Sequence, residues 1–275
     1  MKKNRTLVSL YKFFNSLGID PLKTLSTLRG YPKYFKNLHL LKRSIASSEF
    51  RSLPDSAKHF GSAYPIVDEF FSSAGTASGH YFHQDLLVAN LIYKQKPNLH
   101  LDIGSRIDGF IAHLLSFEQK VILGDVRPIS IDNSNISFVQ MDLTNKLPHE
   151  LSEQYESVSC LHAIEHMGLG RYGDPINAYG HYLALQNLTQ LLTKNGTLYV
   201  SYPFGEKSRI EYNAHRVISL RESRTMFEKN NLIVKKFSYV DDNGNLFETQ
   251  NLEDIDWDNS YGLKYGCAIW TLEKG

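Results

Sequence analysis

"HLDIGSRIDGF", residues 100–110, runs from an apolar strand through a glycine turn into a helix, and the fold class follows from it. The residues before Asp102 form an apolar run, and those after Asp108 recur at helical spacing. A strand, turn and helix of this kind open the nucleotide-binding half of many α/β domains. Two positions that usually carry glycine in such turns hold Arg106 and Asp108 instead, which gives the loop one charge of each sign.

Strand-like and helix-like segments alternate on both sides of this stretch. Strands are expected at 99–105, 120–126, 137–143, 157–163, 196–203, 231–240 and 266–273. Helices are expected at 84–95, 109–117 and 182–192, and the capping pair Ser219 and Glu222 predicts another helix start. Strands that alternate with helices form a parallel sheet covered on both faces. We therefore predict an α/β fold: a doubly wound, mostly parallel sheet of about seven strands, closed by a C-terminal antiparallel hairpin at one edge.

Three regions are predicted: a basic helical N-terminal extension at 1–50, a connecting or lid segment at 51–79, and the α/β domain at 80–275. The first 44 residues carry ten Lys or Arg and one acid, a net charge of +9, whereas the remainder has a net charge of −8. The extension is expected to form short helices broken at "GIDP" (18–21) and "RGYP" (29–32). Its interleaved aromatic and basic residues are typical of an amphipathic element on an anionic membrane surface or a polyanionic acceptor. The alternative is a helical lid packed on the acidic remainder.

Composition and cysteine usage bear on the location of the protein. Cys160 and Cys267 both lie in apolar runs, which favours reduced, buried thiols over a disulfide. No apolar run approaches the roughly 18 residues of a membrane-spanning helix. Lys12 interrupts the N-terminal apolar segment too early for a signal peptide. We expect a cytoplasmic protein, with peripheral contact at the inner face of the membrane as an alternative for the basic extension.

Acidic residues end three successive strands. Asp102 ends the first, Asp125 ends the second 23 residues later, and Asp142 ends the third. The carboxyl ends of parallel strands meet at the ligand-binding edge of such a sheet. An acid at the offset of Asp125 can bind both hydroxyls of a ribose, and Asp142 can accept from the amino group of an adenine. The pattern predicts a ligand that contains a ribose and an adenine.

The charges of the loop discriminate between two ligands of that kind. A dinucleotide brings a diphosphate, which requires a helix N-terminus and close-packed glycines, and Asp108 would repel it. S-adenosylmethionine brings a sulfonium, an ammonium and a carboxylate, and a loop with one acid and one arginine suits this zwitterion. Two interpretations without a ligand stay open: Asp108 caps the helix that begins at Gly109, and Arg106 pairs with Asp108.

The segments "LDIGSRIDGF", "GDVR", "FVQMDL" and "CLHAIEHMGLGRYGDP" together resemble the class I S-adenosylmethionine-dependent methyltransferases. More narrowly, "GLGRYGDP", "YFHQD" and "NAHR" resemble an uncharacterised bacterial family of that Rossmann-like fold, often associated with surface-polysaccharide gene clusters. The similarity spans residues 75–245 and leaves residues 1–50 outside. It implies S-adenosyl-L-methionine as cofactor, with contacts at Asp102, Gly104, Asp125 and Asp142. The predicted cofactor site also includes Ser105, Arg106, Val126, Leu143 and His162, with Tyr81, His83 and Gln84 closing over the cofactor.

Histidines gather after the fourth and fifth strands, where the acceptor pocket of this fold lies. A sugar hydroxyl that attacks a sulfonium methyl group needs a positioned general base, which contributes about 10²–10⁴-fold. We predict His166 as this base, with His215 as the second candidate and Glu165 as the group that orients an imidazole. "HAIEH" (162–166) also matches a metal-binding H-x-x-E-H pattern. Because His162 ends a strand, the two histidines do not share a helix, and no metal is predicted.

"GLGRYGDP" (168–175) is a glycine-rich turn that carries charged and aromatic side chains. The predicted acceptor-binding residues are Arg171, Tyr172, Asp174, Asn213 and Arg216. Arg171 can bind an anionic group such as a phosphate or a carboxylate, and an acceptor of that kind needs no strong base. The alternative is an ion pair between Arg171 and Asp174 that holds the turn. Upstream, Asp85 is expected to cap the helix that follows it.

These observations predict a methyltransferase that O-methylates a sugar or glycan intermediate of surface polysaccharide biosynthesis, with the polysaccharide link resting on the resemblance. The expected partner is a small-molecule or glycan acceptor. No nucleic acid is expected, because the α/β domain is net acidic. Three alternatives stay open: methyl transfer to a phosphate or carboxylate, a non-catalytic binding module that keeps the fold, and an NAD-dependent oxidoreductase, which Asp108 disfavours. The oligomeric state is not predicted.

Overall fold

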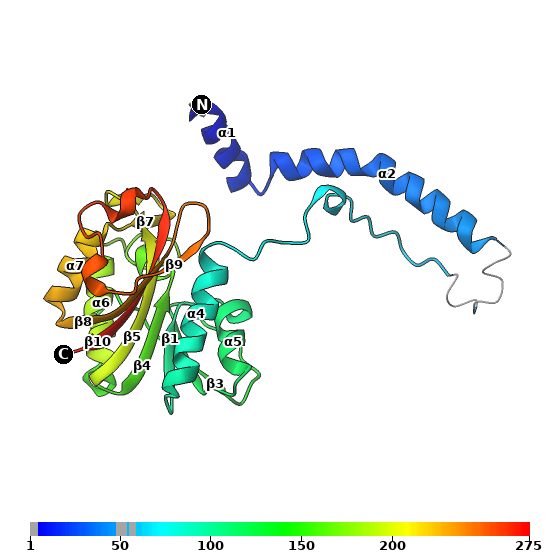
Figure 1. Cartoon of the computed structure of the whole chain (residues 1–275). Coiled ribbons are helices and arrows are strands. Elements are labelled where there is room, and N and C mark those ends of the chain that lie inside the picture. The colour runs from blue at the N-terminus through cyan, green and yellow to red at the C-terminus, as the bar shows by residue number, and fades with distance from the viewer. Residues whose placement is uncertain (1–4, 48–53, 55–58) are drawn as a thin grey trace. The chain divides into compact units, whose positions relative to one another are not determined.

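The structure, a computed structural model, describes residues 5–47, 54 and 59–275 (Figure 1). The chain divides into two compact units, Met1–Thr76 and Ala77–Gly275. Residues 1–4 and 48–50 of the predicted basic extension, and 51–53 and 55–58 of the predicted connecting segment, lie outside the described residues. In the described part of the chain, no helix is long and apolar enough to cross a membrane.

The first unit contains α1 (Arg5–Ser16) and α2 (Pro21–Ile45). Asp20 caps α2, because its side chain accepts from the backbone N–H groups of Leu22 and Lys23, and Pro21 occupies the first helical turn. The predicted break at "GIDP" is therefore confirmed. The predicted break at "RGYP" is wrong, since Pro32 lies inside the 25-residue α2. A proline removes one backbone donor, and the turns on either side of Pro32 keep their own hydrogen bonds.

The segment before Thr76 returns along α2 within the same unit. Gly30 is the close-approach point: a Cβ at this residue would lie 2.1 Å from the carbonyl oxygen of Val67. The short helix η2 (Glu69–Phe71) follows, and Lys33 lies 4.7 Å above the ring of Phe70. At least one basic side chain of the extension therefore contacts an aromatic ring of the same unit through a cation–π interaction.

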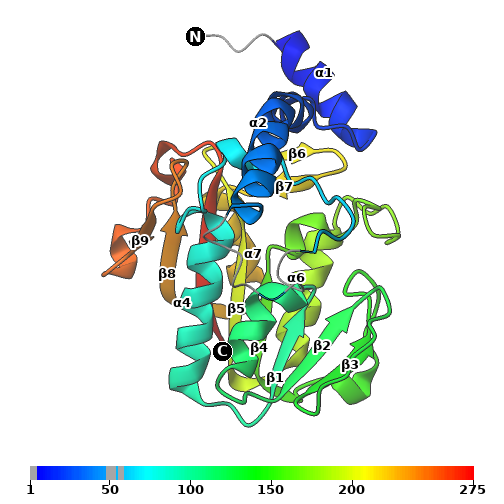
Figure 2. The ribbon, with the colours of Figure 1, turned by 90° about the vertical axis from the view of Figure 1, so that its right-hand side faces the viewer.

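The second unit is built on an eight-stranded sheet in the order β3-β2-β1-β4-β5-β10-β8-β9 (Figure 1, Figure 2). Its strands are β1 (His100–Ile103), β2 (Val121–Asp125), β3 (Ile136–Gln140), β4 (Tyr155–Leu161), β5 (Leu192–Phe204), β8 (Leu232–Val240), β9 (Leu246–Glu248) and β10 (Gly266–Lys274). The first five are parallel, whereas β10 runs antiparallel between β5 and β8. The doubly wound, mostly parallel fold is confirmed. The last strand inserts beside β5, and the short β9 forms the edge.

Helices cover both faces of this sheet. They are α4 (His80–Gln95), the π-helical turn η3 (Ile107–Ile111), α5 (Ala112–Leu115), α6 (Gly180–Leu191) and α7 (Leu220–Lys229). Ser219 caps α7 by accepting from the backbone N–H of Glu222, as its capping pair predicted. The predicted cap at Asp85 is wrong. The helix begins five residues earlier, at His80, and Asp85 lies within it.

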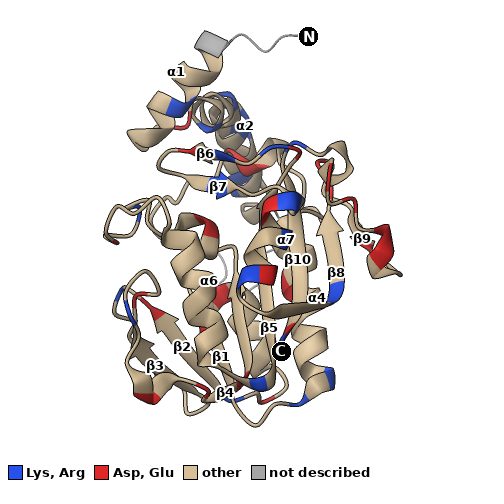
Figure 3. Ribbon diagram, turned by 90° about the vertical axis from the view of Figure 1, so that its left-hand side faces the viewer, with Lys and Arg blue, Asp and Glu red and all other residues tan. Residues whose placement is uncertain are grey.

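Short elements connect these layers. They are the 3₁₀ helices η4 (His149–Leu151), η5 (Ile164–His166), η6 (Leu252–Asp254) and η7 (Ser260–Gly262), and a two-stranded sheet of β6 (Arg209–Glu211) and β7 (His215–Val217). Figure 3 shows acidic and basic residues interspersed over the second unit.

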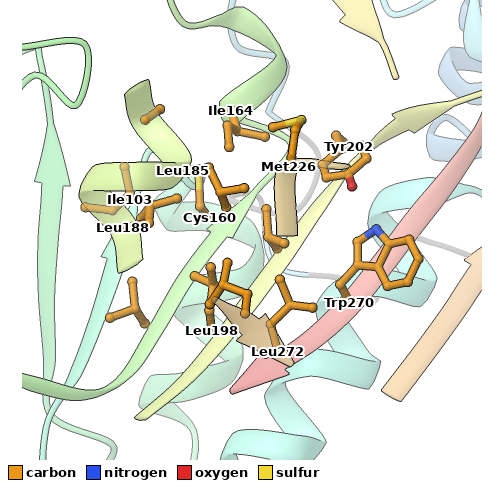
Figure 4. Close-up of a cluster of buried hydrophobic side chains, with 14 of the residues drawn as sticks. Ile103, Cys160, Ile164, Leu185, Leu188, Leu198, Tyr202, Met226, Trp270 and Leu272 are labelled. Atoms are coloured by element: carbon orange, nitrogen blue, oxygen red, sulfur yellow. The ribbon is translucent and has the colours of Figure 1, made fainter. Parts of the chain in front are cut away.

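Two apolar clusters fix the helices on the sheet. Ile103, Cys160 and Leu198 pack with Leu185 of α6 and Trp270 of β10 in the larger cluster (Figure 4). The opposite cluster joins α4 and α5 to the other face through residues Val88, Ile92, Phe110, Leu114 and Val121. All of these side chains are buried, and their packing fixes where the carboxyl ends of the strands lie. The order of connections reverses between β1 and β4, which is where such sheets place a ligand.

Candidate functional site

A cleft of about 1210 Å³ opens at the carboxyl ends of β1, β2 and β4. Its wall is formed by the start of α4, the loop after β1, the segment after β4 and the start of β7. A smaller hollow of about 70 Å³ adjoins it and shares six lining residues with it: Gly104, Asp125, Arg127, His162, His166 and Tyr172. The two hollows bring together most of the residues predicted for the cofactor and the acceptor.

Gly104 and Asp102 shape the loop after β1. Gly104 has a φ of +75°, and a Cβ there would lie 2.9 Å from Cβ of Ala163. The Asp102 carboxylate accepts from Ser105 (backbone N–H at 3.2 Å, Oγ at 2.8 Å) and from Oγ of Ser159 at 2.5 Å. Burial raises the pKa of Asp102 to about 6. Gly104 and Ser105 line the cleft, whereas Asp102 is not among its lining residues and holds the loop from below.

Arg106 and Asp108 pair with each other at the rim of the cleft. Two hydrogen bonds of 3.1 and 2.8 Å join the guanidinium to the carboxylate, and both side chains are about three-quarters exposed. This pair raises the pKa of Arg106 and lowers the pKa of Asp108. The sequence left two interpretations without a ligand, a helix cap at Asp108 and an Arg106–Asp108 pair. The structure shows the pair. No side-chain cap bond is present at η3, so Asp108 does not cap the helix.

Asp125 reaches the cleft, but its carboxylate already has a cationic partner. Arg127 donates to it through Nε and Nη2, both at 3.0 Å, and through its backbone N–H at 2.8 Å. The guanidinium of Arg127 also lies 4.5 Å from the ring centroid of Tyr172. Sequence reasoning missed Arg127, although the "GDVR" segment contains it.

Asp142, Val126 and Leu143 line the smaller hollow. The Asp142 carboxylate accepts from the backbone N–H and hydroxyl of Thr144 at 2.8 and 2.7 Å, and from Nδ2 of Asn145 at 2.7 Å. These bonds fold the chain after β3 into a turn. The contact between Asp142 and an adenine stays a prediction.

The start of α4 contributes Tyr81, Gln84 and Asp85 to the cleft. Tyr81 is 56% exposed, whereas Gln84 is buried and its amide accepts from Ser201 and donates to Asp85. Burial raises the pKa of Asp85. Because Asp85 lies within α4, its carboxylate does not cap the helix but faces the loop after β1. Gly109 leaves room for it, since a Cβ at Gly109 would lie 3.2 Å from Oδ2 of Asp85.

Three residues after β4 form a hydrogen-bonded group. His162 adopts a φ of +50°, and its Nδ1 lies 2.8 Å from Oε1 of Glu165. His166 Nε2 lies 3.8 Å from the same oxygen. Burial opposes both charges of the His162–Glu165 pair, but Cys267 and Glu165 raise the pKa of His162, and His162 lowers the pKa of Glu165. His162 Nε2 and Glu165 Oε2 are buried without a hydrogen-bond partner among the described residues.

His166 has one nitrogen fixed and the other available. Its Nδ1 lies 2.6 Å from the carbonyl oxygen of Ala214, and Nη1 of Arg171 donates to that oxygen at 2.8 Å. A carbonyl only accepts, so Nδ1 carries the proton and Nε2 is the basic nitrogen. Burial lowers the pKa of His166, Glu165 opposes this, and the Arg171 cation adds to the lowering.

His215 lies on the same wall, at the start of β7. Its ring centroid is 6.4 Å from that of His166 and 5.3 Å from that of Tyr265. Burial lowers the pKa of His215, and its Nε2 lies 3.5 Å from Oε2 of Glu211. The structure thus brings both predicted bases to one cleft.

The glycine-rich turn is held by its aspartate. Asp174 accepts from the backbone N–H groups of Gly168, Gly170 and Tyr172 at 2.7, 3.2 and 3.2 Å. The alternative of an ion pair between Arg171 and Asp174 is not what the structure shows. Arg171 and Tyr172 line the cleft, and Asp174 lines the smaller hollow.

Two predicted acceptor-binding residues lie away from the cleft lining. Asn213 is exposed in the turn between β6 and β7. Arg216 is buried, and its guanidinium donates to main-chain carbonyls, the nearest being that of Met167 at 2.7 Å, with those of Glu165, Asn177 and Ala178 at 3.3–3.4 Å. Arg216 therefore clamps the glycine-rich turn from behind.

The cleft residues missed from the sequence include four with polar side chains: His80, Asp85, Arg127 and Tyr265. Asp85 and Arg127 had a local signal, because each lies within a segment that was already singled out. His80 had one as well, because it directly precedes Tyr81, which was predicted to close over the cofactor. Tyr265, which lies far along the chain from His80, had none. Their rings stack at 5.5 Å between centroids, and burial, together with His162, lowers the pKa of His80 to about 4.

Comparisons with solved structures return methyltransferases at low similarity. A 1,6-didemethyltoxoflavin-N1-methyltransferase of Burkholderia thailandensis, solved with 1,6-didemethyltoxoflavin and S-adenosylhomocysteine, is 13% identical over 70% of this chain and 78% of its own, with a TM-score of 0.46. A putative methyltransferase of Bacillus halodurans is 14% identical over 69% and 98%, with a TM-score of 0.48. A putative sarcosine dimethylglycine methyltransferase of Galdieria sulphuraria is 12% identical over 70% and 86%, also with a TM-score of 0.48.

No curated protein matches the chain. A family profile matches residues 116–258, which is just over half of the chain. Its description names Caenorhabditis proteins, not the bacterial family to which the motifs were compared, and it does not mention polysaccharides. The chain belongs to the family described as "Caenorhabditis protein of unknown function, DUF268".

Proposed function

We propose that the chain is an S-adenosylmethionine-dependent methyltransferase that methylates a hydroxyl of a sugar or glycan acceptor, with His166 as the general base. The observation that carries the proposal is the 2.6 Å contact between His166 Nδ1 and the carbonyl oxygen of Ala214. It fixes the tautomer in which Nε2 is unprotonated. The lowered pKa of His166 keeps the ring neutral, as a base near neutral pH requires.

The cofactor is proposed to bind on the side of the loop after β1. Gly104 leaves space that a Cβ would fill, and the buried Asp85 carboxylate offers an anion for the ammonium of the cofactor. A carboxylate accepts about four hydrogen bonds, and Arg127 donates three to Asp125. One acceptor position of Asp125 is therefore left for a ribose hydroxyl. The residues present thus fit S-adenosylmethionine, whose sulfonium would supply the methyl group.

The chain itself would hold and move the proton. Nε2 of His166 takes it from the acceptor hydroxyl, and the carboxylate of Glu165, 3.8 Å away, stabilises the resulting imidazolium. The hydrogen bond from Nδ1 to Ala214 keeps the ring orientation during this step. His215 stays the second candidate for the same role.

An acceptor with a phosphate or carboxylate group is the second candidate. Arg171 favours it, because it lines the cleft without a carboxylate partner in the part of the chain that the structure describes. Such an acceptor is already anionic and requires no base. It would be methylated by a His166 variant as fast as by the wild type.

The test is methyl transfer from S-[methyl-³H]adenosylmethionine to panels of nucleotide sugars, glycans, sugar phosphates and uronic acids. We expect label in an alkali-stable methyl ether with the wild type, loss of transfer with His166→Gln, and retention with His181→Gln, a buried histidine bound to Glu222 outside the cleft. Label in alkali-labile methyl esters that survives His166→Gln would select the second candidate. Absence of transfer to every panel would contradict both.

A further inference from the structure

Three side chains that commonly bind metals meet beside the cleft. They are His80 at the start of α4, His162 after β4 and Cys267 in β10, and one ligand atom of each lies within 4.8 Å of the others. We propose that His80, His162 and Cys267 bind one zinc ion, with a fourth coordination position open to the cleft. The proposal goes beyond the proposed methyl transfer and does not rest on it.

His162 is oriented as a metal ligand. Its Nδ1 is held by Glu165 Oε1 at 2.8 Å, while its Nε2 is buried and has no hydrogen-bond partner among the described residues. Buried polar atoms without partners are rare in folded proteins. A histidine that binds a metal through one nitrogen usually donates through the other to a carboxylate, which fixes the tautomer. Glu165 supplies this carboxylate.

Cys267 brings a sulfur to the same point. Its side chain is fully buried, and its nearest acceptors are distant: Oε1 of Gln84 at 3.8 Å and the carbonyl oxygen of Ala268 at 3.7 Å. A thiol must lose its proton to bind zinc, so binding would release about one proton to solvent. The other free cysteine, Cys160, is equally buried, but it packs in the larger apolar cluster and is not part of the group.

The donor set selects the metal. Two imidazoles and one thiolate suit Zn²⁺, and three protein ligands with an open fourth position are typical of catalytic zinc sites. Bond lengths of about 2.0–2.3 Å place the nitrogen and sulfur atoms of a tetrahedral site about 3.3–3.6 Å apart. The ligand atoms would therefore approach one another by up to about 1.5 Å, and the His80 ring would turn out of its stack on His162. His80 and His162 line the cleft, which directs the open position there.

This site differs from the one that the "HAIEH" pattern suggests. His166 is not part of it, because the clustered ligand atoms belong to His80, His162 and Cys267, and the free Nε2 of His166 faces Oε1 of Glu165 at 3.8 Å instead. Glu165 acts as the support of a ligand rather than as a ligand. The second histidine and the cysteine come from α4 and β10 instead.

The test is a titration of the full chain, after removal of metal with a chelator, with Co²⁺ and then Zn²⁺. We expect one ion per chain, a thiolate-to-cobalt charge-transfer band with the strong visible absorption of a tetrahedral site, and displacement of Co²⁺ by Zn²⁺. Cys267→Ser should abolish the charge-transfer band, and the matched variant Cys160→Ser should keep it. Glu165→Gln should weaken Zn²⁺ binding by about 10–100-fold.

If circular dichroism shows that Cys267→Ser does not fold, the proposal is tested by the wild-type cobalt spectrum and by the zinc affinity of His80→Gln. His80 lies on the cleft wall, so its replacement is expected to leave the fold intact. His80→Gln should lower the affinity at least as much as Glu165→Gln. Failure of the folded wild type to bind either ion, or a band that survives Cys267→Ser, would overturn the proposal. Binding is measured without cofactor or acceptor, so its failure and that of methyl transfer are distinguishable.

Discussion

The two sides of the cleft differ in how their buried polar atoms are satisfied. On the side of β1, β2 and β3, the carboxylates of Asp102, Asp125 and Asp142 each accept several hydrogen bonds from residues two or three positions away, or from a neighbouring strand. These bonds build the loops that follow the strands. This side keeps its shape through contacts within the chain.

On the side of β4 and β7, the buried atoms His162 Nε2 and Glu165 Oε2 have no hydrogen-bond partner in the described residues, and His215 Nε2 has only the Glu211 carboxylate at 3.5 Å. An unsatisfied buried group costs about 1–3 kcal/mol, so these atoms together lower the free energy of unfolding. The first side is therefore a scaffold, whereas the second holds reactive atoms at a cost in stability. Functional chemistry is therefore expected on the histidine side.

The largest expected effect is on turnover, from the histidine side. His166→Ala should lower kcat by about 10²–10⁴-fold and leave cofactor affinity unchanged, because Nε2 serves as the base and does not bind the cofactor. Single-turnover transfer with saturating cofactor measures this effect. Full activity of His166→Ala together with an inactive His215→Ala would assign the base to His215.

The next effect is on stability. Arg216→Ala should lower the free energy of unfolding by about 3 kcal/mol, because it leaves buried carbonyl groups of the glycine-rich turn without their donor. Urea denaturation measures this change, with Arg221→Ala as control, whose exposed pair with Asp258 should contribute less than about 1 kcal/mol. Unchanged stability of Arg216→Ala with loss of acceptor binding would restore the substrate role predicted from the sequence.

A smaller effect is expected on the pH profile. His166 has a lowered pKa, so kcat/KM should be constant near neutral pH and fall below pH 6.5, where protonation of Nε2 removes the base. Arg171→Gln removes a cation that lowers this pKa, and the acidic limb should then move to higher pH. An unmoved limb would show that another group titrates in the profile.

The smallest effect concerns the rim. Both side chains of the Arg106–Asp108 pair are about three-quarters exposed, so replacing both residues by alanine should leave the melting temperature unchanged. Differential scanning calorimetry measures this, and a clear loss of stability would show that the rim belongs to the scaffold.

Local patterns predicted much of the fold. Strand alternation, the cap at Ser219 and the turn at "GIDP" depend on residues a few positions apart, so a sequence displays them directly. The errors at Pro32 and Asp85 have the same origin. Each residue favours a boundary locally, but the helix around it is held by its other hydrogen bonds and by packing.

The site was harder to predict, because its geometry is not local. The sequence placed His162, Glu165 and His166 together, but it contains no sign that Arg216 would meet four carbonyls of another segment. The approach of His80 and Cys267, 187 residues apart, exists only after the last strand inserts beside β5. Strand order decides such contacts, and hydrophobic periodicity does not encode it.

Calorimetric titration with S-adenosylhomocysteine, with NAD as parallel ligand, tests the central claim most directly. We expect micromolar binding of S-adenosylhomocysteine, no binding of NAD, and a loss of about 1–3 kcal/mol of binding free energy in Asp125→Ala. Asp258→Ala, which breaks an exposed Arg–Asp pair far from the cleft lining, should bind as the wild type does. A folded protein that binds NAD instead, or neither ligand, would contradict the account.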